Sequence, residues 1–94
     1  MIQAKTCEFT NCYSEIKGFQ KQKVMVYSAR AVSNGIFMSL TLKSESDVNT
    51  EACLCAAGSF DRIEAFMKYI SENSIGLGSW YGILQDMDIP FTIL

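Results

Sequence analysis

The stretch from Lys23 to Lys43, KVMVYSARAVSNGIFMSLTLK, decides the fold, because two β-prone runs flank the pair Asn34-Gly35. Both residues of this pair tolerate positive φ, as the two-residue type I′ turn of a β-hairpin requires. With this pair as the turn, Ser33 lies opposite Ile36 and Ala31 lies opposite Met38. The sequence therefore predicts an antiparallel hairpin with a defined register.

Side-chain alternation divides the hairpin into two faces. The apolar face, which we expect to turn toward the helices, holds Tyr27, Ala29, Ala31, Met38, Leu40 and Leu42. The other face is largely polar, but it also holds Val26, Val32 and Phe37 beside Arg30. An aromatic anchor inside a polar rim is typical of a protein interface. We therefore expect Val26, Val32, Phe37 and Arg30 to contact a partner protein, unless residues 1–22 fold across them.

The segments on either side of the hairpin complete the predicted sheet. Residues 44–50 are polar and predict a loop, whereas the apolar run over residues 51–57 predicts a third strand, antiparallel to the second. The pattern of residues 1–22 is irregular: Ile2–Lys5 and Thr6–Phe9 could each form a strand, and Tyr13–Lys17 could form a strand or a helical turn. Three or four strands are therefore expected.

Two helices are predicted after the third strand. Ser59 is a suitable N-cap for the first helix, whose apolar stripe is Ile63, Phe66, Met67 and Ile70. A glycine-containing link leads to a shorter helix, which Pro90 stops and whose stripe is Trp80, Ile83, Leu84 and Met87. The sequence thus predicts one α+β domain over residues 1–94, in which both helices pack on one face of a small antiparallel sheet.

Composition is consistent with one folded domain in a reducing compartment. Hydrophobic residues make up 49% of the 94 residues and charged residues only 19%, which favours a packed core over disorder. The sequence contains neither a signal-peptide pattern nor an apolar run long enough to span a membrane. We therefore expect no membrane partner and a cytoplasmic location, in the producing cell or in a host cell.

Charge is divided unevenly along the chain. Residues 1–43 carry six bases and two acids, a net of +4, whereas residues 44–94 carry two bases and eight acids, a net of −6. This split predicts one basic and one acidic region, unless the two signs interleave in the folded chain. The basic run with Lys17, Lys21 and Lys23 could touch phosphates, but the net charge of −2 makes nucleic acid an unfavoured partner.

The residue types present exclude most catalytic arrangements. The chain has no histidine, so Ser-His-Asp and Cys-His pairs and histidine metal ligands are excluded. The glycines of residues 76–82 follow a helix and have no neighbouring base, so they predict a hinge rather than a phosphate loop. We expect no enzyme activity, no catalytic residue and no cofactor.

The four cysteines are Cys7, Cys12, Cys53 and Cys55, and their spacing differs from that of structural zinc sites. Cys53 and Cys55 lie two positions apart in a predicted strand, so both thiols share one face. We interpret all four as small core thiols with no metal bound, and a metal or redox role is the alternative.

The layout of residues 24–88 resembles that of short uncharacterised bacterial proteins. These combine a β-hairpin, a helix that begins at Ser or Asp, and a short closing helix with an acidic end. The corresponding residues here are Ser59-Phe60-Asp61, Trp80 and Gln85-Asp86-Met87. The resemblance implies the α+β architecture and no activity.

Three functional hypotheses remain. The first is a non-enzymatic protein-interaction module that self-associates as a homodimer or other homo-oligomer, because the apolar and aromatic content is high and a catalytic set is lacking. The second is a small acidic inhibitor of the anti-defence type, encoded by a mobile element, whose acidic half occupies a basic groove of a nucleic-acid-handling target. The third is an enzyme or a small-ligand binder.

Overall fold

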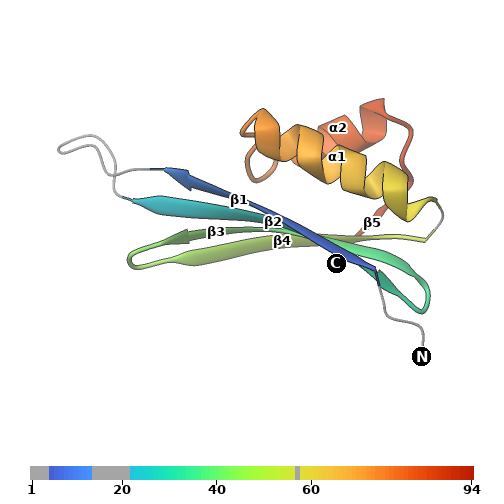
Figure 1. Cartoon of the computed structure of the whole chain (residues 1–94), viewed down its shortest axis with the longest axis horizontal. Helices are drawn as coiled ribbons and strands as arrows, with labels where there is room; N and C mark the ends of the chain where they lie inside the picture. Colours follow the sequence, from blue (N-terminus) through green and yellow to red (C-terminus); the bar gives the residue numbers. More distant parts are fainter. Residues whose placement is uncertain (1–4, 14–21, 57) are drawn as a thin grey trace.

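Strands β2 (Lys23–Val32) and β3 (Gly35–Ser44) form the predicted hairpin at the centre of the sheet. The computed structural model describes residues 5–13, 22–56 and 58–94. Strands β1 (Thr6–Tyr13), β4 (Val48–Cys55) and β5 (Thr92–Ile93) complete an antiparallel sheet in the order β1-β2-β3-β4-β5 (Figure 1). The α+β class is confirmed, but the described sheet has five strands rather than three or four.

The predicted register of the hairpin is wrong by two residues. The turn lies at Ser33-Asn34, and Ala31 is opposite Ile36 instead of Met38. Gly35 belongs to β3, with φ of 146°, and a Cβ built on it would lie 2.3 Å from the carbonyl oxygen of Cys55. Glycine is therefore required at position 35 by the close approach of β4, not by the turn.

The expected division of the hairpin into two faces is nevertheless confirmed. A shift of two residues between paired strands leaves every side chain on its original side, since the side-chain period of a strand is two. Met25, Tyr27, Ala29, Ile36, Met38 and Leu40 are all buried on the side of the helices.

The described part of the N-terminal segment lies at one edge of the sheet. β1 pairs with β2 so that Phe9 is opposite Tyr27, and Ala31 donates a backbone hydrogen bond of 2.8 Å to Lys5. Lys5–Tyr13 thus extends the sheet instead of folding across the hairpin's second face. Ile2–Ala4 of the alternative strand prediction lies outside the described residues.

On the opposite side of the hairpin, β4 begins at Val48 and ends at Cys55, so it begins three residues before the strand predicted over 51–57. Residue 57 of that prediction lies outside the described residues. Val48, Asn49 and Thr50 are all exposed. The sequence around them is mostly polar, which is why it predicted a loop instead of a strand. The C-terminal tail then adds β5, which places Ile93 opposite Cys53.

Helix α1 (Phe60–Glu72) follows the prediction closely. Oγ of Ser59 accepts a hydrogen bond of 3.4 Å from the backbone N–H of Arg62, and the helix ends at Asn73. Its buried stripe is the predicted one, Ile63, Phe66, Met67 and Ile70. α2 (Trp80–Asp86) contributes Trp80 and Leu84 to the same core, whereas Met87 lies beyond its end.

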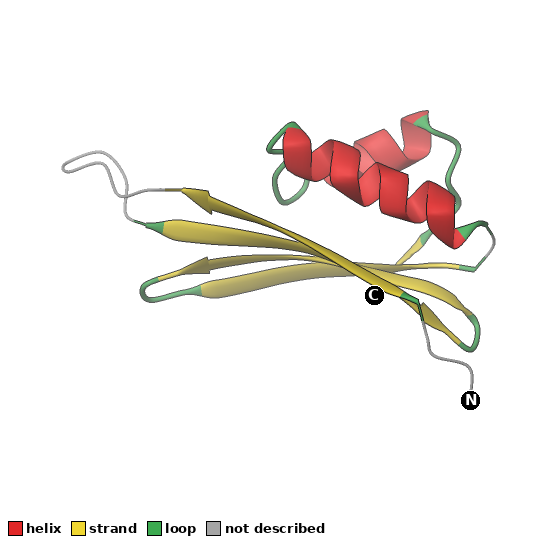
Figure 2. Cartoon of the chain, viewed as in Figure 1, coloured by secondary structure: helices red, strands yellow, loops and turns green. Residues whose placement is uncertain are grey.

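The two helices lie on the same side of the sheet (Figure 2). α1 packs mainly on β1 and β2. The two helices cover only the part of this face near the β2–β3 turn, so their placement differs from the prediction that they cover the face (Figure 1). Neither helix of the described residues has the length and hydrophobicity needed to cross a bilayer.

Candidate functional site

The candidate site is the outer face of the sheet, which we define as the side turned away from α1 and α2. Strand alternation sends every second side chain of β1 to β4 to this face. Among the described strand residues, its charged side chains are Glu8, Arg30 and Lys43. Its apolar side chains, apart from Cys12, are Val24, Val26, Val32, Phe37, Val48, Ala52 and Leu54.

Phe37 and Arg30 form a contact pair on this face, close to the β2–β3 turn. They lie directly opposite each other on β3 and β2, and Cζ of Arg30 lies 5.2 Å from the centroid of the Phe37 ring. Such a distance fits a cation–π contact between the guanidinium and the aromatic ring. Phe37 is partly buried and Arg30 is exposed.

All four residues proposed from the sequence lie on the outer face, but not in one cluster. Val26 is opposite Thr41, four residues along β2 from Arg30, and Val32 is opposite Gly35 beside the turn. Of the four, only Arg30 and Phe37 lie directly opposite each other. Since β1 lies at the edge, the described part of the N-terminal segment covers none of them.

Sequence reasoning missed Leu54, which lies opposite Phe37 on β4. Arg30, Phe37 and Leu54 therefore form one row across three strands. Leu54 could have been found from the side-chain alternation of its strand. Cys53 and Cys55 were expected to share one buried face, so Leu54 between them should point to the outer face.

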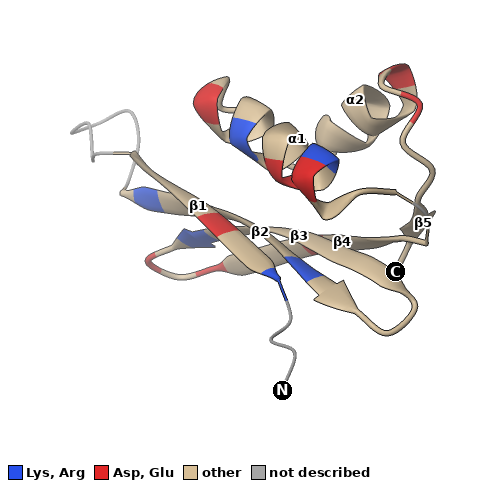
Figure 3. Cartoon of the chain, turned by 45° about the vertical axis from the view of Figure 1, so that its right-hand side comes forward, with Lys and Arg blue, Asp and Glu red and all other residues tan. Residues whose placement is uncertain are grey.

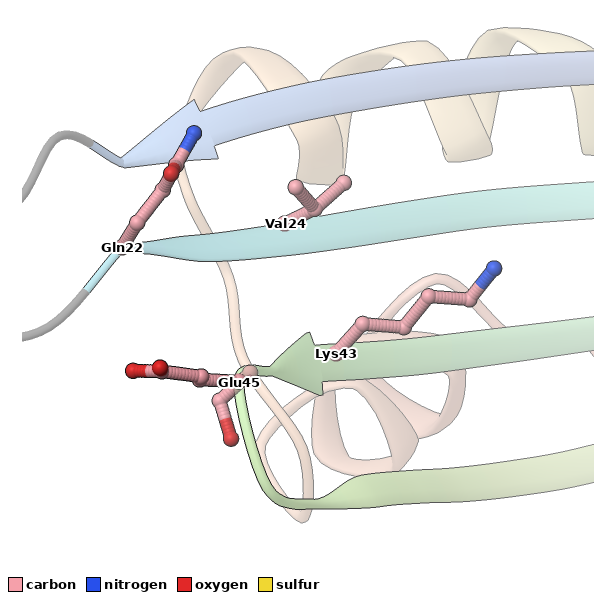
Figure 4. A pocket seen from close by; sticks show the side chains of 5 residues that line it. Gln22, Val24, Lys43 and Glu45 are labelled. Atoms are coloured by element: carbon pink, nitrogen blue, oxygen red, sulfur yellow. The ribbon is translucent and has the colours of Figure 1, made fainter.

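Two shallow depressions lie near the ends of this face. One, of about 550 Å³, is lined by Gln22, Val24, Lys43, Ser44 and Glu45 at the start of β2 and the end of β3 (Figure 4). The second, of about 150 Å³, lies between β4 and the C-terminal tail and is lined by Leu54, Ala56, Pro90, Phe91 and Thr92. In the first depression, the polar side chains of Gln22, Lys43 and Glu45 lie around the apolar side chain of Val24.

The cysteines are not arranged as a common metal site. Cys7 lies on the inner face of β1 and Cys12 on the outer face, whereas Cys53 and Cys55 are both buried in the core. Burial, with a smaller effect of Cys55, raises the pKa of the Cys53 thiol to about 12. No group of three metal-ligating side chains occurs among the residues that the structure describes.

The glycine-containing link between the helices is held by Glu51 of β4. Oε1 of Glu51 accepts hydrogen bonds from the backbone N–H of Gly78 at 2.6 Å and from Nε1 of Trp80 at 2.9 Å. The link is thus a hydrogen-bonded connection between β4 and α2. The Gly78 N–H is thus bonded to a carboxylate of the protein itself, and this geometry does not indicate a phosphate-binding loop.

Among the described residues, the helical segment is acidic, whereas the sheet carries both signs. Residues 60–88, which include both helices, carry five acids and two bases, all exposed, whereas Lys5, Lys23, Arg30 and Lys43 lie on the sheet (Figure 3). The acids Glu8, Glu45, Asp47 and Glu51 also lie on the strands or their turn, so the signs interleave on the sheet and no separate basic region forms among the described residues. Lys17 and Lys21 lie outside the described residues.

Comparisons with protein-family models, curated proteins and solved structures gave no match to this chain.

Proposed function

We propose that this chain is a non-enzymatic protein-interaction module that self-associates and binds protein through the outer face of its sheet. The observation that carries the proposal is that no described element covers this face, although Phe37, Leu54 and several valines lie on it. The exposed face of an antiparallel sheet is ordinarily polar.

The composition of the outer face supports this proposal. Protein interfaces are depleted of charged residues at their centre, except for arginine, and enriched in aromatic residues. The row of Arg30, Phe37 and Leu54 has this composition. Thr6 and Thr92 continue the row at its two ends, and Ser28 and Ser39 lie in the next row of the same face. Such side chains lose little conformational freedom on binding.

The ionisable groups argue against catalysis. Catalytic thiols need a lowered pKa, whereas burial raises the pKa of Cys53 to about 12 and that of Cys7 above its usual value. With no histidine in the sequence, an acid–base pair would need other residues. Cys7, Cys12 and Cys53 are free thiols, as a reducing compartment favours, and we propose that the module acts in the cytoplasm of the producing or host cell.

The proposal is tested by solution mass and by selective capture. Sedimentation equilibrium should give a mass above the 10.5 kDa of one chain. A partner captured from the native cell by the wild type should be lost with Phe37→Glu and retained with Tyr69→Glu, since Tyr69 is 52% exposed on α1. A mass of 10.5 kDa at every concentration, together with identical capture by both variants, would overturn the proposal.

The acidic inhibitor is retained as a second candidate because one observation favours it. The seven charged residues of 60–88 are all exposed and give this part of the surface a net charge of −3 (Figure 3). For this function, Glu64→Lys and Glu72→Lys should weaken capture of a basic partner, and added salt should do the same. Unchanged capture by these two variants excludes it.

A further inference from the structure

The two edges of the sheet differ in how they are protected. β5 has two residues and follows Pro90 closely, which makes it a short edge that a further strand cannot easily extend. β1 has eight residues, contains no proline, and within the described residues pairs only with β2. Glu8 is its single charged residue. β1 therefore lacks the features that usually prevent an edge strand from pairing with another chain.

The direction of the backbone groups along β1 follows from one hydrogen bond. Ala31 N–H donates to the carbonyl of Lys5, so these two opposite residues form a hydrogen-bonded pair. Such pairs alternate along an antiparallel ladder. The N–H and C=O groups of Cys7, Phe9, Asn11 and Tyr13 therefore face β2, whereas those of Thr6, Glu8, Thr10 and Cys12 point out of the sheet.

We propose that β1 pairs antiparallel with β1 of a second copy of this chain, about a two-fold axis at Phe9. The two sheets then become one continuous sheet, and the two outer faces become one surface. This inference rests on the self-association proposed above and names the contact through which it occurs.

The register follows from hydrogen bonding and charge. Residues whose N–H and C=O groups point out of the sheet must lie opposite residues of the same kind in the second copy. The two-fold axis must therefore pass beside a residue and not between two residues. With the centre at Phe9, Thr6 faces Cys12 of the partner subunit and Glu8 faces Thr10 of the partner subunit, so every outward-pointing residue is paired. A centre at Glu8 would bring two carboxylates face to face, and a centre at Thr10 would pair fewer of the described outward-pointing residues, because no described residue would lie opposite Thr6.

The side chain at the centre fits the same arrangement. Phe9 is partly buried against the core, and it faces the inner side of the sheet. In the proposed register it lies opposite Phe9 of the partner subunit in a non-hydrogen-bonded pair, the type in which side chains approach most closely. Aromatic pairs across strands are among the more stabilising ones, and this pair would cover the exposed part of both rings.

A disulfide test detects this register directly. The variant Thr6→Cys should form a disulfide-linked dimer with the native Cys12 of the partner subunit under mild oxidation, because paired Cα atoms lie about 5.5 Å apart. Within one chain the two positions are about 20 Å apart along the strand and cannot be bridged. The wild type and the double variant Thr6→Cys/Cys12→Ser should give no linked dimer.

A proline variant tests the edge without a new thiol. Thr10→Pro removes an N–H that points away from β2, so the monomer should keep its circular dichroism spectrum while its mass falls from twice 10.5 kDa to 10.5 kDa. Thr10→Val keeps the N–H and should remain dimeric.

The outcomes separate this inference from the proposed function. If the wild type has twice the mass of one chain but Thr6→Cys gives no linked dimer and Thr10→Pro keeps that mass, edge pairing is wrong while self-association stands. A linked dimer of the Thr6→Cys/Cys12→Ser variant would overturn the register. If the wild type is a monomer at every concentration, the self-association of the proposed function is itself wrong.

Discussion

Trp80 Nε1 donates a hydrogen bond of 2.9 Å to Oε1 of Glu51, and the same oxygen accepts a 2.6 Å bond from the backbone N–H of Gly78. Glu51 lies on β4, and Trp80 is the fully buried first residue of α2. One carboxylate thus connects the sheet to the start of the second helix. Because α2 has only seven residues, we infer that this contact contributes much to its placement.

We predict that Glu51→Ala lowers the free energy of unfolding by about 1–3 kcal/mol, because it leaves the part-buried indole N–H and the Gly78 N–H without their acceptor. Glu51→Gln should cost less, since its amide oxygen can still accept. Urea denaturation of Glu51→Ala, Trp80→Phe and the double variant measures the coupling. Strictly additive losses would show that the contact contributes nothing.

Gly35 gives a second prediction. Gly35→Val should lower the free energy of unfolding by at least about 2 kcal/mol, since the new Cβ would lie 2.3 Å from the Cys55 carbonyl oxygen at a φ of 146°. Gly82→Ala is the matched control, because nothing lies within 4 Å of the added Cβ and the residue is inside α2, where alanine is favoured. Chemical denaturation of both variants checks the difference, and equal midpoints would contradict it.

The core stripe of α1 gives a third. Phe66 is fully buried, so Phe66→Ala should cost about 3–5 kcal/mol, which is enough to unfold a domain of this size. Tyr69→Ala, one turn along on the exposed side, should cost less than about 1 kcal/mol. Thermal melting followed by circular dichroism distinguishes them, and a small loss for Phe66→Ala would mean that α1 does not pack on the sheet as described.

Local periodicity was sufficient to predict the helices and the two faces of the hairpin. The Ser59 cap and the stripe of Ile63, Phe66, Met67 and Ile70 depend on residues close in sequence, and the structure confirms them. The faces of β2 and β3 were also correct, because a two-residue error in register does not move a side chain to the other side.

The errors concern interactions between residues far apart in sequence. The turn was assigned to Asn34-Gly35, but Gly35 is needed beside Cys55, twenty residues later, and no local pattern shows that contact. Strand β5 depends on pairing of Ile93 with Cys53, and Leu54 joins the candidate site only through its pairing with Phe37. Pairing partners of this kind are not determined by local propensity, which is why the strand number was too low.

The last prediction concerns alkaline pH and follows from two buried groups. Burial, with smaller effects of the neighbouring Tyr13, raises the pKa of Tyr27 to about 12, and burial raises the pKa of Cys53 to about 12 as well. The neutral Tyr27 hydroxyl also donates a 2.8 Å hydrogen bond to the carbonyl of Ile75. Between about pH 9 and pH 12 the unfolded chain therefore binds fewer protons than the folded chain, so stability must fall as the pH rises.

Urea denaturation at several values from about pH 8 to about pH 11 measures this loss as a falling free energy of unfolding. Cys53→Ala removes one of the two titrating groups, so its stability should start lower but decline less steeply with pH than that of the wild type. Cys12→Ala removes an exposed thiol and should leave the wild-type slope unchanged. If Cys53→Ala and Cys12→Ala decline with the same slope as the wild type, the burial of Cys53 does not govern the alkaline stability of the fold.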